Sequence, residues 1–448
     1  MASEMIDNYI DEHVDDSMEQ LARLVAQPSI SSQNVGMEAC ADLVATILEE
    51  HGFQARILPG ERYPVVYAES GGGSDRTLIC YNHYDVQPPE PLEGWDSPPF
   101  EATRKGNKVY GRGICDDKGE LISRLAALRA LREVNGDLPC RVKFLVEGGE
   151  EIGSPDIPAF VREHRDLLAA DGCVWETGGV DHVGRPQVIL GMRGLCYVQL
   201  NARAMRRDAH SGGAHVLPNA AWRLVRALNS IKDENERILI PGFYDDAQEP
   251  GEAERGLFGA MPNEEAAVKE SYGIDSFVLG LTGAAAREAV YGPTANICGL
   301  ASGYQGPGTK TVIPANAMCK IDFRLIPDQD PEDIAAKLRH FLDDQGFDDI
   351  EIEYLGGERA ATTPVDDPLV QITLRTAREI YNREPVVVPL VGGSGPMYPF
   401  RKDLKVPIVP CGFSYPESYV HAPNENIVID LFVQATKHMV RITEGFAV

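Results

Sequence analysis

The sequence predicts a two-domain α/β protein, in which a mostly parallel, doubly wound main domain is interrupted by an inserted ferredoxin-like α+β domain. Three observations support this prediction. The chain of 448 residues is too long for one ordinary hydrophobic core. Strand and helix patterns alternate through its first third, and after Gly194 the order of elements changes to β-α-β-β-α-β.

The first third contains two helical segments before its first strands. Apolar residues recur at helical spacing over Ile6–Val25 and Ala39–Leu48. Asp117–Leu131 is also predicted to be helical, with Asp117 near its cap. Short apolar runs predict strands at Val65–Ala68, Thr77–Tyr81, Val142–Val146, Gly172–Trp175 and Val188–Leu190. Such alternation is typical of a largely parallel sheet.

The inserted domain is predicted from a second series of patterns. Its elements are the strand Cys196–Leu200, the helix Leu217–Leu228, the strands Ala295–Leu300 and Ala317–Leu325, the helix Pro331–Leu342 and the strand Ile350–Tyr354. A charged segment from about Asp233 to Val290 separates the first helix from the second strand. The chain then returns to the main domain and ends in a helix near Ile427–Ile442. The predicted domains are therefore 1–192 and 358–448 for the main domain and 193–357 for the insert.

Composition excludes several classes of partner. The net charge of −26 should repel nucleic acids and anionic membranes, so we expect neither as a partner. The N-terminus lacks a signal-like apolar run, and no apolar stretch approaches the roughly 20 residues that span a bilayer. The nine cysteines are scattered, and several lie in apolar runs. We therefore expect a cytoplasmic protein whose cysteines are reduced, with core positions at Cys80, Cys173, Cys196 and Cys319.

Polar side chains follow several predicted strands, beginning with His83 and Asp85. These two residues lie two apart and should project to the same side. A metal-bound imidazole usually donates its other N–H to an oxygen, so His83 is a candidate ligand and Asp85 its partner. The structural alternative is a buried histidine capped by an aspartate.

The other candidates are Asp116, Glu150, Glu151, Glu176 and His421. A carboxylate at Asp116 has two oxygens and could bridge two cations, while one residue of the Glu150–Glu151 pair could bind metal and the other move a proton. Each also has an ordinary explanation: a solvated turn, an acidic loop, a strand end reaching solvent or a loop histidine.

The candidates are stronger as a set. His83, Asp116, Glu151 and Glu176 are expected at the carboxyl ends of predicted parallel strands, where open α/β sheets bind ligands. Imidazole and carboxylate together suit a divalent metal. The set therefore predicts a two-metal hydrolase.

The stretches His83-Tyr84-Asp85-Val86-Gln87-Pro88 and Asp116-Asp117-Lys118-Gly119 resemble the M20 family of metallopeptidases, and most of all its cytosolic carnosinase-type dipeptidases. The similarity runs from the first helix to the last. It implies that Asp116 bridges two ions, with His83 and Glu176 completing one site and Glu151 and His421 the other. It also implies that Glu150 is the general base, that Asp85 orients His83, and that the peptide bond after Asp116 is cis.

The resemblance further implies that the inserted domain is a lid and dimerisation domain. His210 would reach into the active site of the partner in a homodimer, and Arg324 would hold the substrate carboxylate in two places. Gly393, Ser394 and Asn296 would contribute to substrate binding. Without the resemblance, His210 would be a surface histidine and Arg324 a strand-end ion-pair partner.

The expected activity is cleavage of the amide bond of dipeptides or related small peptides with a free carboxylate, by a metal-activated water from which Glu150 takes a proton. Two divalent ions are expected, zinc first, with manganese or cobalt as alternatives. The alternative substrate is an N-acyl amino acid, because Glu176 replaces the aspartate usual in the dipeptidases and Glu147-Gly148-Gly149 replaces a more acidic lead-in. A catalytically silent binding or scaffold homologue would require a lost ligand or base, and every such position is filled. A dinucleotide-binding oxidoreductase would require Gly-x-Gly-x-x-Gly after the first strand, which the chain lacks there.

Overall fold

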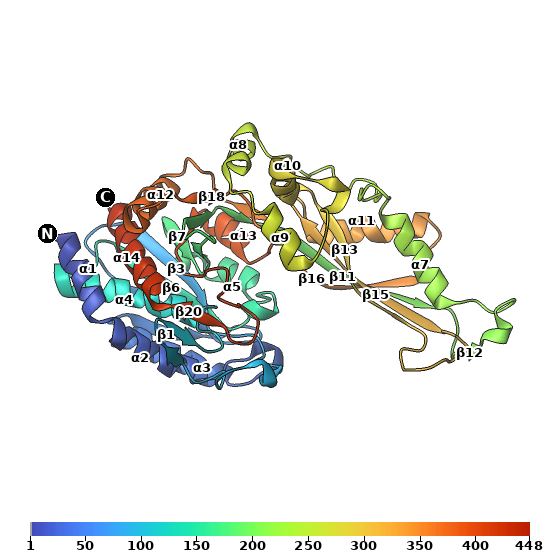
Figure 1. Cartoon of the computed structure of the whole chain (residues 1–448), viewed down its shortest axis with the longest axis horizontal. Coiled ribbons are helices and arrows are strands. Elements are labelled where there is room, and N and C mark those ends of the chain that lie inside the picture. Colours follow the sequence, from blue (N-terminus) through green and yellow to red (C-terminus); the bar gives the residue numbers. More distant parts are fainter. Residues whose placement is uncertain (1) are drawn as a thin grey trace. The chain divides into compact units, whose positions relative to one another are not determined.

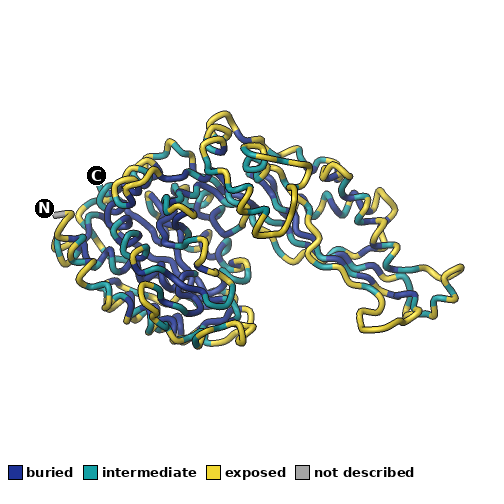
Figure 2. The backbone as a smooth tube through the Cα atoms, viewed as in Figure 1, coloured by how far each residue is buried: buried dark blue, intermediate teal, exposed yellow. Residues whose placement is uncertain are grey.

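The computed structural model describes residues 2–448, which divide into two compact units (Figure 1). The first unit comprises the chain up to Leu190 together with Thr362–Pro389 and Pro396–Val448. The second comprises Gly191–Ala361 and the short segment Leu390–Gly395. Figure 2 shows a buried interior in each unit. No helix in the described range is long and apolar enough to cross a membrane.

The central sheet of the first unit has six strands in the order β1-β2-β6-β3-β7-β19. Neighbouring strands among β6, β3, β7 and β19 are parallel, whereas β1 and β2 form an antiparallel edge. This confirms the prediction of a mostly parallel sheet. The strands are β1 (Gln54–Leu58), β2 (Val65–Ser70), β3 (Thr77–His83), β6 (Arg141–Glu147), β7 (Gly172–Trp175) and β19 (Ile408–Pro410).

The same unit contains two smaller, three-stranded sheets. One, in the order β20-β5-β4, joins β4 (Thr103–Lys105) and β5 (Lys108–Tyr110) to β20 (Asn426–Val428). The other joins β8 (Gly179–Val180) and β9 (Pro186–Ile189) to β18 (Val386–Val388). The strand predicted near Val188 therefore exists as β9 but belongs to this separate sheet and not to the central one.

Helices pack around α4 (Lys118–Asn135), most of which is buried. Its packing partners include α1 (Ala2–Glu12), α2 (Val14–Val25) and α14 (Ile429–Phe446), and α14 also packs on α12 (Pro368–Tyr381). The remaining helices of this unit include α3 (Met37–Glu50), α5 (Ile157–Glu163), α6 (Arg165–Leu168) and α13 (Met397–Pro399).

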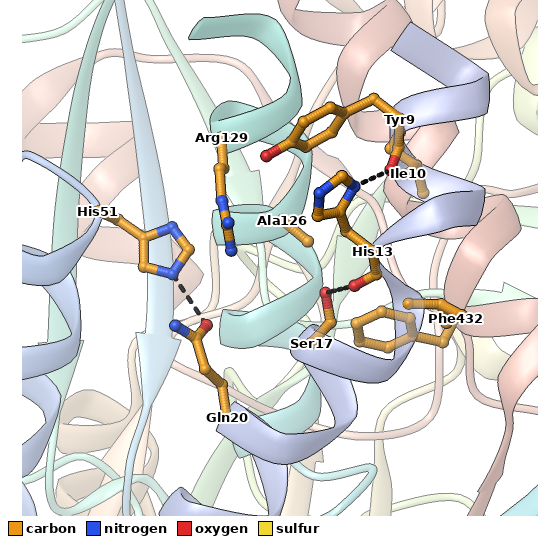
Figure 3. A pocket seen from close by; sticks show the side chains of 10 residues that line it. Tyr9, Ile10, His13, Ser17, Gln20, His51, Ala126, Arg129 and Phe432 are labelled. Atoms are coloured by element: carbon orange, nitrogen blue, oxygen red, sulfur yellow. Dashed lines mark hydrogen bonds between the residues drawn. The ribbon is translucent and has the colours of Figure 1, made fainter. Parts of the chain in front are cut away.

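The helix predicted over Ile6–Val25 is in fact two helices, because His13 leaves the helical conformation (φ −113°, ψ 18°). Figure 3 shows this junction beside α4: the ring of His13 stacks on Tyr9, and its Nδ1 lies 2.8 Å from the Tyr9 carbonyl oxygen. These residues line a small pocket, and on its other side His51 Nε2 lies 2.8 Å from Gln20 Oε1. Apolar periodicity continues through the break, which is why it did not reveal the junction.

The second unit contains a four-stranded antiparallel sheet in the order β13-β15-β11-β16. Its strands are β11 (Gly194–Arg203), β13 (Thr294–Ser302), β15 (Asn316–Leu325) and β16 (Ile350–Glu358), and it packs against α7 (Ala220–Ile231) and α11 (Pro331–Asp344). The first strand lies between the third and fourth, so the predicted β-α-β-β-α-β arrangement is confirmed. The segment before β13 forms three helices: α8 (Glu252–Ala260), α9 (Glu265–Tyr272) and α10 (Gly283–Glu288).

The nine cysteines are free, and all but Cys298 are buried. Four of them had been expected in apolar runs: Cys80, Cys173, Cys196 and Cys319. Burial raises the pKa of Cys80 to about 12, so this thiol stays protonated at neutral pH. These residues therefore act as small apolar core side chains.

Candidate metal centre

His83 is the last residue of β3, and its side chain is almost fully buried. Its Nδ1 lies 3.1 Å from the carbonyl oxygen of Asp85 and 3.3 Å from Asp85 Oδ1. Its Nε2 lies 2.9 Å from Asp116 Oδ1. One ring nitrogen is thus oriented by Asp85, while the other faces the carboxylate of Asp116.

Asp116 occupies the centre of the site. Its Oδ1 faces His83, and its Oδ2 lies 3.1 Å from Nε2 of His421. Burial would raise the pKa of Asp116, but hydrogen bonds with His421 and His83 bring it below its usual value. Two oxygens facing two different imidazoles are the arrangement that a bridging carboxylate requires.

The location of Asp116 in the fold corrects one expectation. It does not end a strand of the parallel sheet but lies in the turn between β5 and α4, and β5 belongs to the small antiparallel sheet. The peptide bond between Asp116 and Asp117 is cis. Asp117 precedes α4 with its carboxylate turned inward, where Oδ2 accepts hydrogen bonds from Asn82 Nδ2 and from the backbone N–H of His83.

Glu151 approaches Asp116 from the short 3₁₀ helix Glu150–Ile152, and His421 approaches it from the loop before β20. His421 Nε2 lies 3.1 Å from Glu151 Oε2, and one ligand atom from each of Asp116, Glu151 and His421 lies within 4.8 Å of the others. Gln87 Nε2 donates to Glu151 Oε2 at 2.8 Å. Hydrogen bonds with Asp116 and Glu151 raise the pKa of His421 to about 10. Residues that are distant in sequence therefore form one compact three-ligand group.

Glu176 is buried beside this group, and Glu150 next to Glu151 is partly buried. Burial raises the pKa of Glu176 to about 8, and the charge of Asp117 adds to this effect. Burial also raises the pKa of Glu150 well above its usual value, although the charge of His83 opposes the shift. Glu176 interacts with His83 and Asp116 through charge, and the three-ligand group does not include it.

The donor set fits divalent cations. The carboxylates of Asp116, Glu150, Glu151 and Glu176 lie beside two imidazoles, those of His83 and His421, so negative charge is in excess in this partly buried space. Burial is the main cause of the raised carboxyl pKa values at Glu150 and Glu176, and the neighbouring carboxylates add to it. A cation among these oxygens would remove the penalty, and carboxylates mixed with imidazoles suit zinc-like metals.

Sequence reasoning did not identify a buried arginine beneath the site. Arg124 on α4 is fully buried and donates from Nη1 to the carbonyl oxygen of Tyr81 at 2.8 Å and from Nη2 to that of Trp175 at 2.5 Å. Nη2 also lies 3.2 Å from Glu120 Oε2. It thus links the ends of β3 and β7, beside His83 and Glu176. The available signal was a charged i,i+4 pair within the apolar face of a helix.

The expected substrate residues lie in the second unit. Arg324 Nη1 donates to Ser394 Oγ at 2.8 Å, and its Nε lies 3.4 Å from Asp322 Oδ2. The carbonyl oxygen of Gly393 accepts a hydrogen bond from the backbone N–H of Arg193 at 2.9 Å. Asn296 on β13 pairs in register with Asp322 on β15. The structure therefore joins Arg324 directly to Ser394. It also places Asn296 beside β15, the strand that carries Arg324.

His210 also lies in the second unit, in the short strand β12 (Ala209–His210), and its side chain is exposed. Its Nδ1 accepts a hydrogen bond from the backbone N–H of Gly212 at 3.0 Å, which orients the ring. The other ring nitrogen, Nε2, lies 3.5 Å from Thr311 Oγ1, at the limit of hydrogen-bond distance. The metal-ligand candidates all belong to the first unit.

Comparison with known proteins gives consistent matches over most of the chain. A family model described as Peptidase family M20/M25/M40 matches residues 79–445. Beta-Ala-His dipeptidase of Mus musculus is 27% identical over 410 residues, which cover 86% of this chain and 83% of the relative. Cys-Gly metallodipeptidase dug1 of Schizosaccharomyces pombe is 26% identical over 364 residues, which cover 76% of each chain.

Solved structures show the same relationship. The M20 family metallo-carboxypeptidase Sso-CP2 from Sulfolobus solfataricus has a TM-score of 0.92 and 35% identity, with 96% of this chain and 99% of that chain covered. Human carnosine dipeptidase 1 has a TM-score of 0.81 and 26% identity, with 99% of both chains covered. Since the family model spans most of the sequence and the fold agrees throughout, the chain belongs to the M20/M25/M40 family of metallopeptidases.

Proposed function

We propose that this chain is a dinuclear-metal dipeptidase, which cleaves the amide bond of dipeptides or related small peptides that carry a free carboxylate. The observation that carries the proposal is the double contact of Asp116, whose two oxygens face His83 and His421 respectively. Relatives named dipeptidases support the substrate class.

Five residues would hold the metals. Asp116 would bridge, His83 and Glu176 would complete one site, and Glu151 and His421 the other. When bound, two divalent ions supply Lewis acidity and lower the pKa of water. Zinc is the proposed native metal, and manganese and cobalt tolerate the same mixture of imidazole and carboxylate.

Glu150 is the proposed general base. Its backbone N–H and that of Glu151 donate to the two oxygens of Asp85, at 3.2 and 3.1 Å, so its position in the turn is held by a buried carboxylate. Glu150 would take a proton from the attacking water and deliver it to the departing amide nitrogen. The high pKa that burial and its anionic neighbours give Glu150 suits a group that must hold this proton between the two steps.

Arg324 is the proposed anchor for the substrate carboxylate, with Ser394, Gly393 and Asn296 beside it. A guanidinium can pair with a carboxylate through two parallel hydrogen bonds. The Arg324 side chain is partly exposed and its Nη1 is already oriented by Ser394 Oγ. An arginine in this position would favour substrates with a free C-terminal carboxylate over the corresponding peptide amides.

The second unit is also the proposed site of homodimer formation, in which His210 would act on the partner's active site. Large apolar side chains are exposed on two of its elements, Trp222 and Val225 on α7 and Ile297 and Leu300 on β13. Among the residues that the structure describes, β13 is an edge strand of its sheet, with no strand paired to its outer side. Exposed apolar patches and free strand edges are typical of surfaces that pair with another chain.

The test is a substrate panel with metal-free protein reloaded with zinc, manganese or cobalt. The panel contains β-Ala-His, Cys-Gly, other dipeptides, tripeptides, dipeptide amides and N-acyl amino acids, with the Glu150→Gln variant as the inactive control. We expect dipeptides to be cleaved and their C-terminal amides to be cleaved far more slowly. Faster hydrolysis of N-acyl amino acids than of every dipeptide would contradict the proposed substrate class.

A further inference from the structure

We propose that Glu425 is a positioning residue, which locks the loop that carries Asp116 to the loop that carries His421 and so sets the affinity of the metal centre. The inference rests on the proposed roles of Asp116 and His421 as ligands. Glu425 was not among the residues expected from the sequence, and it is not a member of the three-ligand group.

The Glu425 carboxylate accepts all its hydrogen bonds from the turn that leads to Asp116. Oε1 accepts hydrogen bonds from the backbone N–H groups of Cys115 (2.9 Å) and Asp116 (3.1 Å). Oε2 accepts one from Gly113 N–H at 3.1 Å and one from Arg112 Nη1 at 2.6 Å. An ionised carboxylate offers about four acceptor positions, and all are used here.

These contacts replace the regular hydrogen bonding that the turn lacks. Residues 111–117 lie between β5 and α4 and belong to neither a helix nor a strand. Both Glu425 and Arg112 are about 1% exposed, so water does not compete for their interactions. Buried backbone N–H groups need acceptors, and here the side chain of Glu425 is the acceptor for three of these groups. The orientation of the Asp116 backbone therefore depends on Glu425.

The same residue is fixed relative to His421. Strand β20 begins directly after Glu425, and Asn426 pairs with Tyr110 at the end of β5. The carbonyl oxygen of Glu425 accepts the N–H of Gly111 at 3.0 Å. The chain that leaves β5 leads to Asp116, and the chain that enters β20 comes from His421, so Glu425 lies where the two ligand loops meet.

If Glu425 did not hold the two loops together, the proposed ligands Asp116 and His421 would be less well positioned. His421 has a backbone φ of +64°, and its side chain is half exposed, so packing alone holds it weakly. Its Nε2 must meet Oδ2 of Asp116, which is carried by a turn without regular structure. Partners that orient metal ligands typically contribute 10–100-fold to metal affinity or activity. We expect an effect of this size from Glu425.

The test variant is Glu425→Gln, which keeps the side-chain volume but sets an amide N–H₂ group against backbone donors. Asp181→Asn is the matched control. Asp181 is also buried, accepts the N–H groups of Val183 and Arg185 at 3.0 and 2.8 Å, and pairs with the Arg185 side chain. Its turn carries no proposed ligand.

The measurements are metal affinity by competition with a chromogenic chelator, metal content per chain, the melting temperature of the metal-free protein, and kcat and KM. We expect Glu425→Gln to bind at least one ion 10–100-fold more weakly, with kcat restored toward wild type at high metal concentration. Asp181→Asn should retain wild-type metal affinity even if its melting temperature falls. Equal metal affinity in Glu425→Gln and wild type overturns the inference, as does an equal loss in both variants.

If Glu425→Gln does not fold, Arg112→Lys is the second variant. It leaves the three backbone contacts of Glu425 in place and weakens the fourth, together with the contacts of Arg112 with the Pro88 carbonyl oxygen and the Trp95 ring. A smaller loss of metal affinity is then expected, and no loss would overturn the inference. Failure of the proposed function is distinguishable, since wild-type protein would then bind fewer than two ions. If wild type binds two ions and the variants do too with equal affinity, only the role of Glu425 is wrong.

Discussion

The Asp85 carboxylate accepts a hydrogen bond from the backbone N–H of Glu150, with 3.2 Å between Oδ1 and the nitrogen. The same oxygen lies 3.3 Å from Nδ1 of His83. One fully buried carboxylate therefore orients both a proposed metal ligand and the turn that bears the proposed base. Its role is wider than the orientation of His83 alone.

We accordingly predict that Asp85→Ala lowers both metal affinity and kcat, each by roughly 10–100-fold, because partners of metal-binding histidines commonly have effects of that size. Asp85→Asn keeps an oxygen for one contact and should lose less. Chelator competition and steady-state kinetics on the two variants measure the effects. A drop in kcat at saturating metal without any change in metal affinity would show that His83 does not need Asp85.

Glu150→Gln should abolish turnover while metal content stays near that of wild type. Glu150 is proposed to move protons, and general-base contributions are typically about 10²–10⁴-fold. Glu151→Gln is the matched comparison, because Glu151 Oε2 lies 3.1 Å from His421 Nε2 in the three-ligand group and should be needed for metal. Metal analysis and activity are measured for both variants. Loss of metal from Glu150→Gln and retention by Glu151→Gln would mean that the roles are exchanged.

Wild-type protein should bind two divalent ions per chain, and His421→Ala should bind fewer at the same free metal concentration. His421 contacts both Asp116 and Glu151, so its removal takes a ligand from one site and leaves His83 at the other. Elemental analysis after equilibrium dialysis gives the stoichiometry. Full activity of wild-type protein with a single ion at saturation would contradict the two-metal proposal.

The main architecture could be predicted from the sequence because the spacing of apolar residues shows which side of a helix or strand is buried. Both units have a buried core of this kind. The strand predicted to end at Tyr81 continues as β3 to His83, and the order of the second sheet follows from its elements. Helix boundaries were less accurate: α7 starts at Ala220 and not near Leu217, because Asn219 caps it by accepting from the N–H groups of Ala221 and Trp222. Apolar spacing carries no information about such a cap.

The same limit applies to the site. Asp116 was expected after a parallel strand, yet it is held in a turn by contacts from Glu425, which lies 309 residues later in the chain. No local pattern reveals a side chain that satisfies the backbone of a distant loop. The pairing becomes apparent only when β5 and β20 are seen side by side. Motifs can identify the residue types of a metal centre, but long-range hydrogen bonds position them.

Glu358 leads to a prediction of pH dependence. Burial raises its pKa to about 7, although Arg324 opposes the shift, and its Oε2 has no hydrogen-bond partner. A carboxyl whose pKa is higher in the folded protein lowers the free energy of unfolding when it ionises. This loss of stability is absent below about pH 4.5 and complete above about pH 7.

Glu358→Gln removes that cost. The melting temperature of the metal-free variant, relative to metal-free wild type, should therefore rise as the pH increases from 5 to 8. Glu351→Gln is the control, because Glu351 is exposed on the same strand, β16. Thermal unfolding followed by circular dichroism at several pH values gives both differences. A difference between Glu358→Gln and wild type that does not change with pH would show that this carboxyl does not ionise in the range.

The last prediction concerns His210 and the proposed dimer. Gly212 N–H orients the exposed imidazole through Nδ1. The other nitrogen, Nε2, has only a 3.5 Å contact with Thr311 Oγ1 and would exchange it for a developing negative charge. A donor aimed at the oxyanion of a tetrahedral intermediate is worth roughly 10²–10³ in rate. His210→Ala should therefore lower kcat by about that factor and leave metal content unchanged.

Action across the dimer can be tested by complementation. His210→Ala subunits and Glu150→Gln subunits are each nearly inactive, but a mixed dimer would hold one site with both groups intact. Mixing should thus restore up to about half of the activity per mixed dimer, because only one of two sites is complete. Native mass spectrometry with one subunit isotopically labelled confirms that exchange has occurred. If mixed dimers form and activity stays at the background of the single variants, His210 works within its own chain or outside catalysis. If the protein is monomeric at assay concentration, the exposed apolar side chains of α7 and β13 do not form a homodimer interface, and His210 cannot act across one.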